Sequence, residues 1–320
     1  MRKVLIGGVA ALLLLAAASP FILWHVPGPL TRETSVQIPE GVSVAGAARL
    51  LKKAGAIRNP VLFRRFSRYF GSGDPIKAGE FALPRHASAA TILDMLQHGK
   101  PIQRLITVPE GMPSIMVHER LMAEPLLTGP VDVPAEGSIL PDSYSFERGE
   151  TRAAVVKRMQ SAMARTLAKL WAARKPTAVV KSPQDAIILA SIVEKETGKP
   201  AERRMVAGVY GNRLRIGMAL QADPTVIYPI TKGKPLGRRI LKSELLADNG
   251  YNTYVRPGLP DGPIANPGRA SIAAVLDPAP TKALYFVADG TGGHVFADTL
   301  AQHQANVFKW YEIRRKRGEM

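Results

Sequence analysis

The sequence predicts an α+β protein in which an N-terminal transmembrane helix precedes a small α+β module and a larger α+β domain. Three observations predict this organisation. The chain has 320 residues, enough for about two globular domains. An uncharged apolar run begins at residue 4. A short strand, a proline-containing turn and a helix recur between residues 36 and 122. We place the boundaries at 1–31, 32–100 and 101–320.

Composition restricts the possible functions. Lysine and arginine number 43 against 26 acidic residues, a formal charge of +17, which indicates an anionic partner. Hydrophobic residues make up 46% and charged residues 22%, so the chain is not intrinsically disordered. Cysteine is absent, which excludes disulfides, thiolate metal sites and thiol nucleophiles.

The N-terminal run, Val4 to Trp24, carries no formal charge and is long enough to cross a bilayer core, which takes about 20 helical residues. Arg2 and Lys3 favour a cytoplasmic N-terminus, and Trp24 stands where an interfacial aromatic anchor would. A cleaved signal peptide is the alternative, because residues 16–18 are all alanine. Residues 21–24 extend the apolar run beyond that site and favour the anchor. Both interpretations export the protein.

The segment after the apolar run begins with a short linker at Gly28–Arg32, where neighbouring prolines break the helix. The recurring strand–turn–helix units then cover residues 36–51, 80–96 and 106–122. Their number and irregular spacing argue against a solenoid.

Three helices are predicted in the first half of the larger domain. Residues 151–175 form an amphipathic helix with an apolar residue every four positions. Ser182 and Pro183 begin a second helix, which Gly198 closes in the left-handed conformation. Residues 186–193 are uncharged, so this helix runs through the core. A further helix covers 201–216, and long ordered loops follow Gly217.

Glu194 emerges at the end of the buried helix, and it is the candidate general acid. On helical spacing it stacks on Ile187, Ala190 and Ser191, which are small or apolar. A carboxylate against such a wall is costly to ionise and could stay protonated near neutral pH. The alternative is that residues 194–196 are only the solvated end of a core helix.

Polar and aromatic side chains follow this helix in a pattern that suits sugar binding by edge-on hydrogen bonds and ring stacking. We expect them to line a carbohydrate cleft. The candidates are Gln221, Asp223, Thr225, Asn252 and Tyr254, together with the upstream Glu136 and Tyr144.

Several long motifs, in order, resemble the endolytic murein transglycosylases, the MltG or YceG-like family. They are LASIVEKET at 189–197, NRLRIGM with LQADPTVIY at 212–228, YNTY at 251–254, GLPDGPIANPG at 258–268 and YFVADGTGGHVF at 285–296. EGSILPDSY at 136–144 is similar to a further element of the family.

The resemblance implies a single-pass protein of the cell inner membrane, with its N-terminus in the cytoplasm and a LysM-like module and catalytic domain in the periplasm. It implies cleavage within peptidoglycan glycan strands, between N-acetylmuramic acid and N-acetylglucosamine, leaving 1,6-anhydro ends and terminating strand elongation. It assigns the catalysis to Glu194, and it implies peptidoglycan synthases (penicillin-binding proteins) as partners. We expect no cofactor, no metal and no nucleic acid.

Alternatives remain at several points. A lytic transglycosylase needs one carboxyl group, but Asp223 could serve as a second carboxylate and make the enzyme a hydrolase. Glu136 and Asp142 are weaker candidates for that role, better suited to the cleft wall or to loop capping. His294 and His303 lack a third nearby ligand and are poor evidence for a metal. A non-catalytic, membrane-anchored peptidoglycan-binding scaffold and a cytoplasmic nucleic-acid binder are the competing functions.

Overall fold

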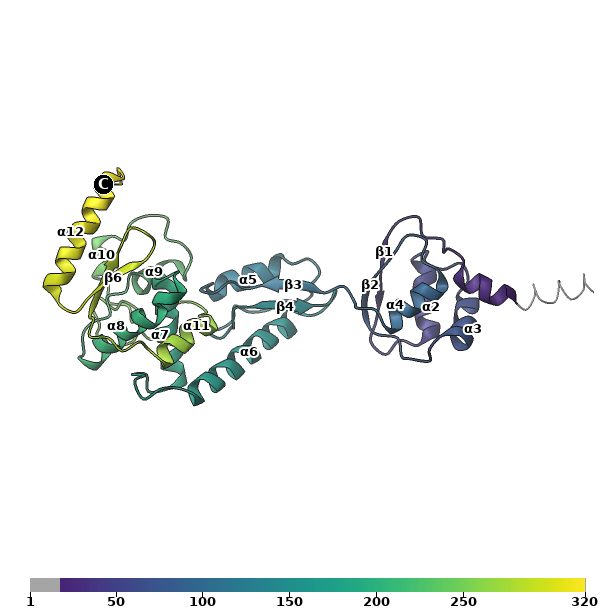
Figure 1. The fold of residues 1–320 in the computed structure, drawn as a ribbon, viewed down its shortest axis with the longest axis horizontal. Helices are drawn as coiled ribbons and strands as arrows, with labels where there is room; N and C mark the ends of the chain where they lie inside the picture. Colours follow the sequence, from purple (N-terminus) through teal and green to yellow (C-terminus); the bar gives the residue numbers. More distant parts are fainter. Residues whose placement is uncertain (1–17, 320) are drawn as a thin grey trace, which may run out of the picture. The chain divides into compact units, whose positions relative to one another are not determined.

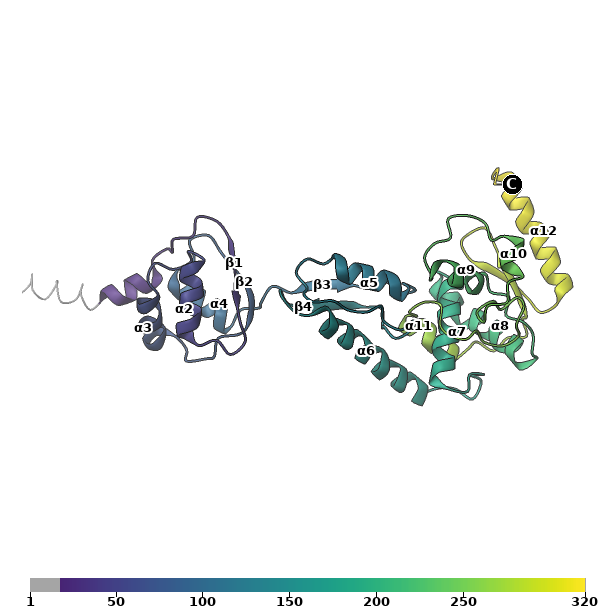
Figure 2. The same ribbon diagram turned by 180° about the vertical axis from the view of Figure 1, so that it is seen from behind.

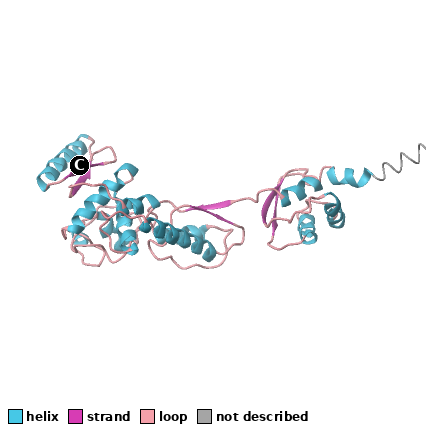
Figure 3. Ribbon diagram, turned by 60° about the horizontal axis from the view of Figure 1, so that its bottom comes forward, coloured by secondary structure: helices cyan, strands magenta, loops and turns pink. Residues whose placement is uncertain are grey.

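The computed structural model describes residues 18–319 and has an α+β fold, which confirms the predicted class (Figure 3). Short helices dominate, and the described strands form three two-stranded sheets. The chain divides into two compact units, Met1–Arg104 and Leu105–Met320 (Figure 1). Each unit has a hydrophobic core of its own.

The first unit packs four helical segments against one antiparallel strand pair. β1 pairs with β2 in a register that joins Val36 to Phe81 at the centre. Serine side chains cap two of the helices by accepting backbone N–H bonds, Ser43 at α2 and Ser88 at α4. The elements are a helical segment at 18–25, β1 (Thr34–Ile38), α2 (Val44–Lys53), α3 (Pro60–Phe70), β2 (Gly79–Leu83) and α4 (Ala89–Gln97).

Trp24 belongs to the core of this unit, which corrects its predicted place as an interfacial anchor. Its side chain is only 2% exposed, and its ring lies 5.6 Å from that of Phe63 on α3. Leu30 is buried as well, and the Gly28 N–H donates to the His86 carbonyl. Residues 28–32 therefore pack on the unit and do not form a free linker, because their apolar side chains find a core to bury against.

The predicted transmembrane helix falls mostly outside the described residues, since residues 4–17 are not among them. Between residues 18 and 319, no helix combines the length and apolar character that crossing a membrane requires.

The second unit begins with two strands that lie between two helices (Figures 1 and 2). β3 pairs with β4, and one apolar cluster joins both strands to α5 and α6. α6 starts after its cap Thr151, and the predicted stripe of Val155, Met159 and Met163 is buried. The elements are β3 (Arg104–Thr107), α5 (Ser114–Ala123), β4 (Ser143–Phe146) and α6 (Arg152–Ala172).

The rest of the second unit surrounds α7, which packs against α6, α8, α9 and α11. Ser182 and Asp185 form a capping box at its start, and residues 186–193 are all buried, as predicted. The elements are α7 (Pro183–Glu196), a 3-10 turn (Pro200–Glu202), α8 (Arg203–Arg215), α9 (Asp223–Thr231), α10 (Lys242–Leu245), α11 (Arg269–Leu276), β5 (Tyr285–Ala288), β6 (His294–Ala297) and α12 (Leu300–Lys316).

The end of α7 differs from the predicted one. α7 ends because Thr197 adopts an extended conformation, and Gly198 is not in the left-handed region. The Thr197 side chain donates to Glu202 and accepts from the Lys199 N–H, which stabilises this sharper exit. Long loops follow Gly217 as predicted, the longest at 246–268, with helices and a hairpin between them.

Replacing the buried indole of Trp24 should destabilise the first unit. We expect Trp24→Ala to lower its free energy of unfolding by about 3–5 kcal/mol, the usual cost of a large core aromatic. Tyr69→Ala is the matched control, because Tyr69 is an aromatic of the same unit that is 70% exposed, and it should change that free energy by less than about 0.5 kcal/mol. Denaturant titration of the full chain measures both. Equal effects of the two variants would contradict the placement of Trp24.

Candidate active site

The two glutamates at the end of α7 point to different sides of the helix. Glu194 and Glu196 are two positions apart, and residues at that spacing do not face each other on a helix. The surrounding elements differ accordingly. Glu194 faces the start of α11 and Arg203, whereas Glu196 faces α8 and the residues at the start of α9.

Glu194 is held by charged and polar partners, not by the apolar wall expected from the sequence. Its side chain is 5% exposed, and Arg203 donates to its Oε1 at 3.3 Å. The N–H of Gly268, the N-cap of α11, donates to its Oε2 at 2.9 Å. A carboxylate at a helix N-terminus is stabilised by the unpaired N–H groups there. Glu194 therefore bridges α7, α8 and α11 through its two side-chain oxygens.

Arg203 connects this bridge to the start of the second unit. The same guanidinium nitrogen that contacts Glu194 also donates to Glu110 at 2.9 Å. Glu110 packs so closely on Gly268 that any side chain there would overlap its carboxylate. A side chain at position 268 would therefore force the Glu110 carboxylate to move. One arginine thus offsets two carboxylates, and these contacts leave Glu194 no free face for a substrate.

Glu196 lies in a different environment, among hydroxyl groups and a second carboxylate. It is partly buried, and its neighbours are Tyr210 and Arg213 of α8, with Asp223 and Tyr254 nearby. The Tyr254 hydroxyl donates to Asp223 at 2.6 Å. Arg213 is anchored by the Leu284 and Leu220 carbonyls, which accept at 2.7 and 2.5 Å.

The electrostatics of this cluster favour a protonated carboxyl group. Burial raises the pKa of Glu196 to about 7, and the nearby Asp223 charge adds to the rise. Hydrogen bonding from the Tyr210 hydroxyl and the positive charge of Arg213 oppose it in part. A carboxyl group with a pKa near 7 can both donate and accept a proton at neutral pH.

Of the predicted binding residues, Asp223 and Tyr254 lie near Glu196, and Gln221 lies at the surface two residues before Asp223. Gln221 and Asp223 are exposed and Tyr254 is half-buried. Gln221 has a left-handed backbone, with a φ of +50°, and its N–H donates to the Thr253 carbonyl. Non-glycine residues in this conformation are uncommon and are found where the surrounding structure imposes them.

Thr225 and Asn252 are fully buried and hold the loops behind these residues. The Thr225 hydroxyl donates to the Ala222 carbonyl and contacts the Thr253 hydroxyl at 2.8 Å. The Asn252 amide donates to the backbone carbonyls of residues 244, 245 and 247, and its side-chain oxygen accepts from the Tyr254 N–H. These two side chains position the surface residues and have no exposed group for a sugar.

Glu136 and Tyr144 are not part of the Glu196 cluster. Glu136 accepts from the Ser114 N–H at 2.9 Å and so caps α5, and burial raises its pKa. It also interacts with Tyr228. Tyr144 is buried, its hydroxyl donates to the Leu140 carbonyl at 2.6 Å, and burial raises its pKa to about 12.

Three further residues considered from the sequence, Asp142, His294 and His303, also form local contacts. Asp142 accepts from the Ser143 N–H, which is a loop-capping contact. His294 pairs with Glu202 at 2.8 Å, and the ring of His303 stacks on Tyr285.

Two residues of this region, Glu196 and Asn266, were not among the candidates predicted from the sequence. In the sequence, Glu196 follows Lys195 at a helix end and looks like an exposed charged residue. It differs from Glu194 only in the residues that other elements place around it. Asn266 is fully buried and accepts from the Ile139 N–H while donating to Met112 and Ser114. It joins the segments before α5, before β4 and before α11, and the ANPG stretch that carries it was the available signal.

Residues 36–309 match the YceG-like family. The chain therefore belongs to the YceG-like family, and the resemblance inferred from its motifs is confirmed.

Individual relatives agree with this membership. The endolytic murein transglycosylase of Streptococcus pneumoniae D39 is 29% identical over 85% of this chain and 57% of its own length. The enzyme of the same name from Bacillus subtilis 168 is 28% identical over 88% of this chain and 86% of its own. A yceG-like protein from Listeria monocytogenes has a crystal structure that aligns with a TM-score of 0.55 at 27% identity, covering 86% of this chain and 98% of that one. The chain thus spans little more than half of the pneumococcal relative.

Replacing Arg203 should lower the free energy of unfolding, because the buried Glu194 side chain then loses its charged partner. We expect Arg203→Met to lower the free energy of unfolding of the second unit by about 3–5 kcal/mol, because an unpaired buried carboxylate remains. Adding Glu194→Gln should restore part of that loss. Glu110→Gln alone should cost less than about 1 kcal/mol, because Glu110 is largely exposed. Denaturant titrations test this cycle, and an Arg203→Met cost that Glu194→Gln does not relieve would contradict it.

Proposed function

We propose that this chain is an endolytic murein transglycosylase that cleaves peptidoglycan glycan strands between N-acetylmuramic acid and N-acetylglucosamine and leaves 1,6-anhydro ends. The names of the pneumococcal and Bacillus relatives support this activity. The observation that carries the proposal is Glu196, a partly buried carboxyl group with a pKa near 7 beside exposed polar side chains.

We assign the general acid–base role to Glu196 in place of Glu194. Glu194 is 5% exposed, and both of its oxygens accept hydrogen bonds from groups of the protein. These bonds tie Glu194 to α8 and α11 and leave its carboxyl group little exposure to a substrate. Glu196 is protonated in a large share of molecules near neutral pH and borders the surface where Gln221, Asp223 and Tyr254 lie.

The reaction then needs only one carboxyl group. Glu196 donates its proton to the glycosidic oxygen as the bond to C1 of the muramic acid breaks, which leaves a positive oxocarbenium-like centre. The C6 hydroxyl of the same sugar attacks C1 and passes its proton to the Glu196 carboxylate. The proton is thereby returned, no water is consumed, and the 1,6-anhydro ring forms. General acid–base catalysis of this kind contributes roughly 10²–10⁴ in rate.

The neighbours of Glu196 have separate roles in this scheme. Tyr210 and Arg213 stabilise the carboxylate form after the first proton transfer, through a hydrogen bond and a positive charge. Asp223 favours the protonated form before it, and its negative charge also stabilises the oxocarbenium-like centre. Gln221 and Tyr254 contact the sugar. Thr225 and Asn252 keep these residues in place from within.

A second candidate function follows from Asp223. Two carboxyl groups near each other are the arrangement of a glycoside hydrolase, in which one protonates the leaving oxygen and the other assists a water or attacks the sugar. The hydrogen bond from Tyr254 keeps Asp223 in place for either role. The products separate the two functions, because hydrolysis gives reducing ends and the transglycosylase gives anhydro ends.

The remaining parts of the chain complete the proposal. The first unit would include the LysM-like module and would hold glycan strands. The apolar run that begins at residue 4 would anchor the protein in the cell inner membrane ahead of Trp24, which packs in the first unit, with the N-terminus in the cytoplasm and both units in the periplasm. Peptidoglycan synthases would be the partners whose new strands the enzyme cuts, which would end their elongation. A non-catalytic peptidoglycan-binding scaffold is the alternative.

Substituting each glutamate of the pair should separate their roles. We expect Glu196→Gln to reduce release of anhydro ends from purified glycan strands by about 10²–10⁴, because the amide cannot deliver a proton. Mass analysis of the strand ends measures this, and circular dichroism checks that the fold is kept.

Glu194→Gln is the matched control. It is the same substitution two residues away, and at a temperature where the variant is folded we expect activity within about tenfold of the parent. Loss of activity in folded Glu194→Gln with normal activity in Glu196→Gln would return the catalytic role to Glu194. Normal activity in both would favour a different catalytic group, and no release by the parent would favour the scaffold.

A further inference from the structure

The end of the N-terminal helical segment exposes three consecutive large apolar side chains. Phe21 is 57% exposed, and Ile22 and Leu23 are each about half exposed, whereas the next residue, Trp24, is buried in the first unit. The indole thus ties this segment directly to the folded unit. A monomeric soluble protein rarely leaves such a patch uncovered without a partner.

The outer face of α3, in the same unit, exposes further apolar side chains. Val61 and Tyr69 are 63% and 70% exposed and lie eight positions apart, on the side of the helix opposite the buried Phe63. Leu62 is exposed beside them.

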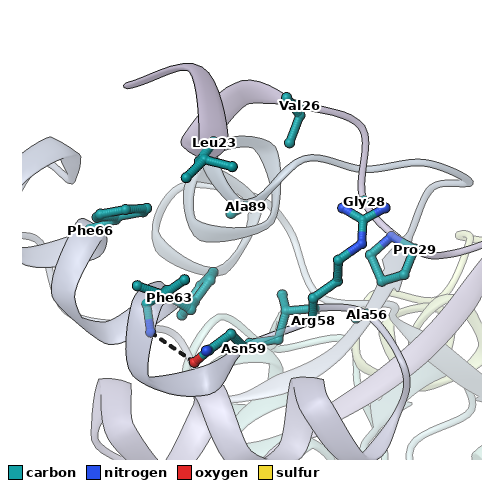
Figure 4. A pocket seen from close by; sticks show the side chains of 12 residues that line it. Leu23, Val26, Gly28, Pro29, Ala56, Arg58, Asn59, Phe63, Phe66 and Ala89 are labelled. Carbon is teal, nitrogen blue, oxygen red and sulfur yellow. Dashed lines mark hydrogen bonds between the residues drawn. The ribbon is translucent and has the colours of Figure 1, made fainter. Parts of the chain in front are cut away.

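The two segments lie side by side in the first unit. Phe21 contacts Phe70 of α3 edge-on at 6.0 Å between ring centres, and Trp24 contacts Phe63. A mainly apolar pocket of about 150 Å³ lies between the N-terminal helical segment and α3. Its wall includes Leu23 from the first and Leu62 from the second (Figure 4). We call the exposed residues of 21–23 and α3 the interfacial face.

Positive charge is interleaved with these apolar groups. Arg64, Arg65 and Arg68 are exposed on α3, and the helix contains no acidic residue. Within residues 18–319, no carboxylate forms an ion pair with any of the three. A helix that mixes exposed aliphatic and aromatic groups with arginines is the pattern of a segment that lies in a membrane interface.

We propose that the interfacial face docks on a bilayer surface that contains anionic phospholipid. The sequence immediately before it, residues 4–17, is uncharged and apolar. The face therefore begins where the proposed anchor leaves the membrane, and the burial of Trp24 leaves no free spacer between them. Arginines near an anionic surface are attracted to it, and the aromatic rings suit the headgroup region. Docking would hold the first unit against the membrane and limit how far the catalytic unit reaches.

Peptidoglycan is the competing occupant, since its stem carboxylates would also attract arginine. It does not account for the exposed Ile22, Leu23 and Val61, because a hydrated polymer gives aliphatic side chains little to bury against. The two occupants therefore predict different surroundings for position 61.

The absence of cysteine allows a direct test in the full chain. Val61→Cys labelled with an environment-sensitive fluorophore is mixed with vesicles of phosphatidylcholine alone or with one-third phosphatidylglycerol added. We expect a blue shift and quenching by lipids carrying acyl-chain spin labels when anionic lipid is present. Combining the label with Arg64→Gln, Arg65→Gln and Arg68→Gln should abolish both, and high salt should weaken them.

Ser35→Cys on β1 is the control label, because β1 lies on the far side of the unit from residues 18–25 (Figures 1 and 2). It should stay in water throughout. A label at position 61 that also stays in water, that is shielded by glycan strands instead of vesicles, or that responds equally to both vesicle types would overturn the proposal. Glycan cleavage by the arginine variants, assayed without vesicles, should match the parent, which separates a failure here from a failure of the proposed activity.

Discussion

The site depends on one geometric constraint. Glu194 and Glu196 are two positions apart at the end of a buried helix, so their side chains point to different sides of its axis. α7 is fixed on all sides by its apolar residues, so the directions of its last side chains are fixed as well. Glu194 must turn toward α11, where Arg203 and the Gly268 N–H offset its charge. Glu196 must turn toward α8 and the start of α9, where burial keeps it partly protonated. The end of α7 thus carries one glutamate that joins neighbouring helices, Glu194, and one whose pKa is raised to about 7, Glu196.

The surroundings of the pair reinforce this division. On the Glu194 side, Arg203 and Asn266 join segments far apart in the sequence, and their hydrogen bonds are nearly all internal. On the Glu196 side, some polar side chains point into the protein and others face solvent. Asn252 and Thr225 point inward to backbone partners, while Asp223 remains exposed. A rigid inner shell of this kind is what holds catalytic groups in a reactive geometry.

The features of the fold that depend on neighbouring residues in the chain were predicted correctly from the sequence. The α+β class, the cap and buried length of α7 and the stripe of α6 follow from periodicity and capping chemistry. The different surroundings of Glu194 and Glu196 could not be predicted from the sequence, because they depend on Arg203 and Asp223 meeting α7 from other elements. Trp24 was misplaced for the same reason, since its partner Phe63 comes from a separate helix.

The protonation state of Glu196 is the central claim, and carboxyl-carbon NMR measures it directly. The full chain is labelled with ¹³C at glutamate side chains and titrated, with Glu196→Gln used to assign the resonance. The account predicts a midpoint near pH 7, because burial and the nearby Asp223 charge disfavour the carboxylate. A midpoint near the ordinary value of 4.5 would contradict it, since Glu196 would then be ionised at neutral pH and could not act as the acid.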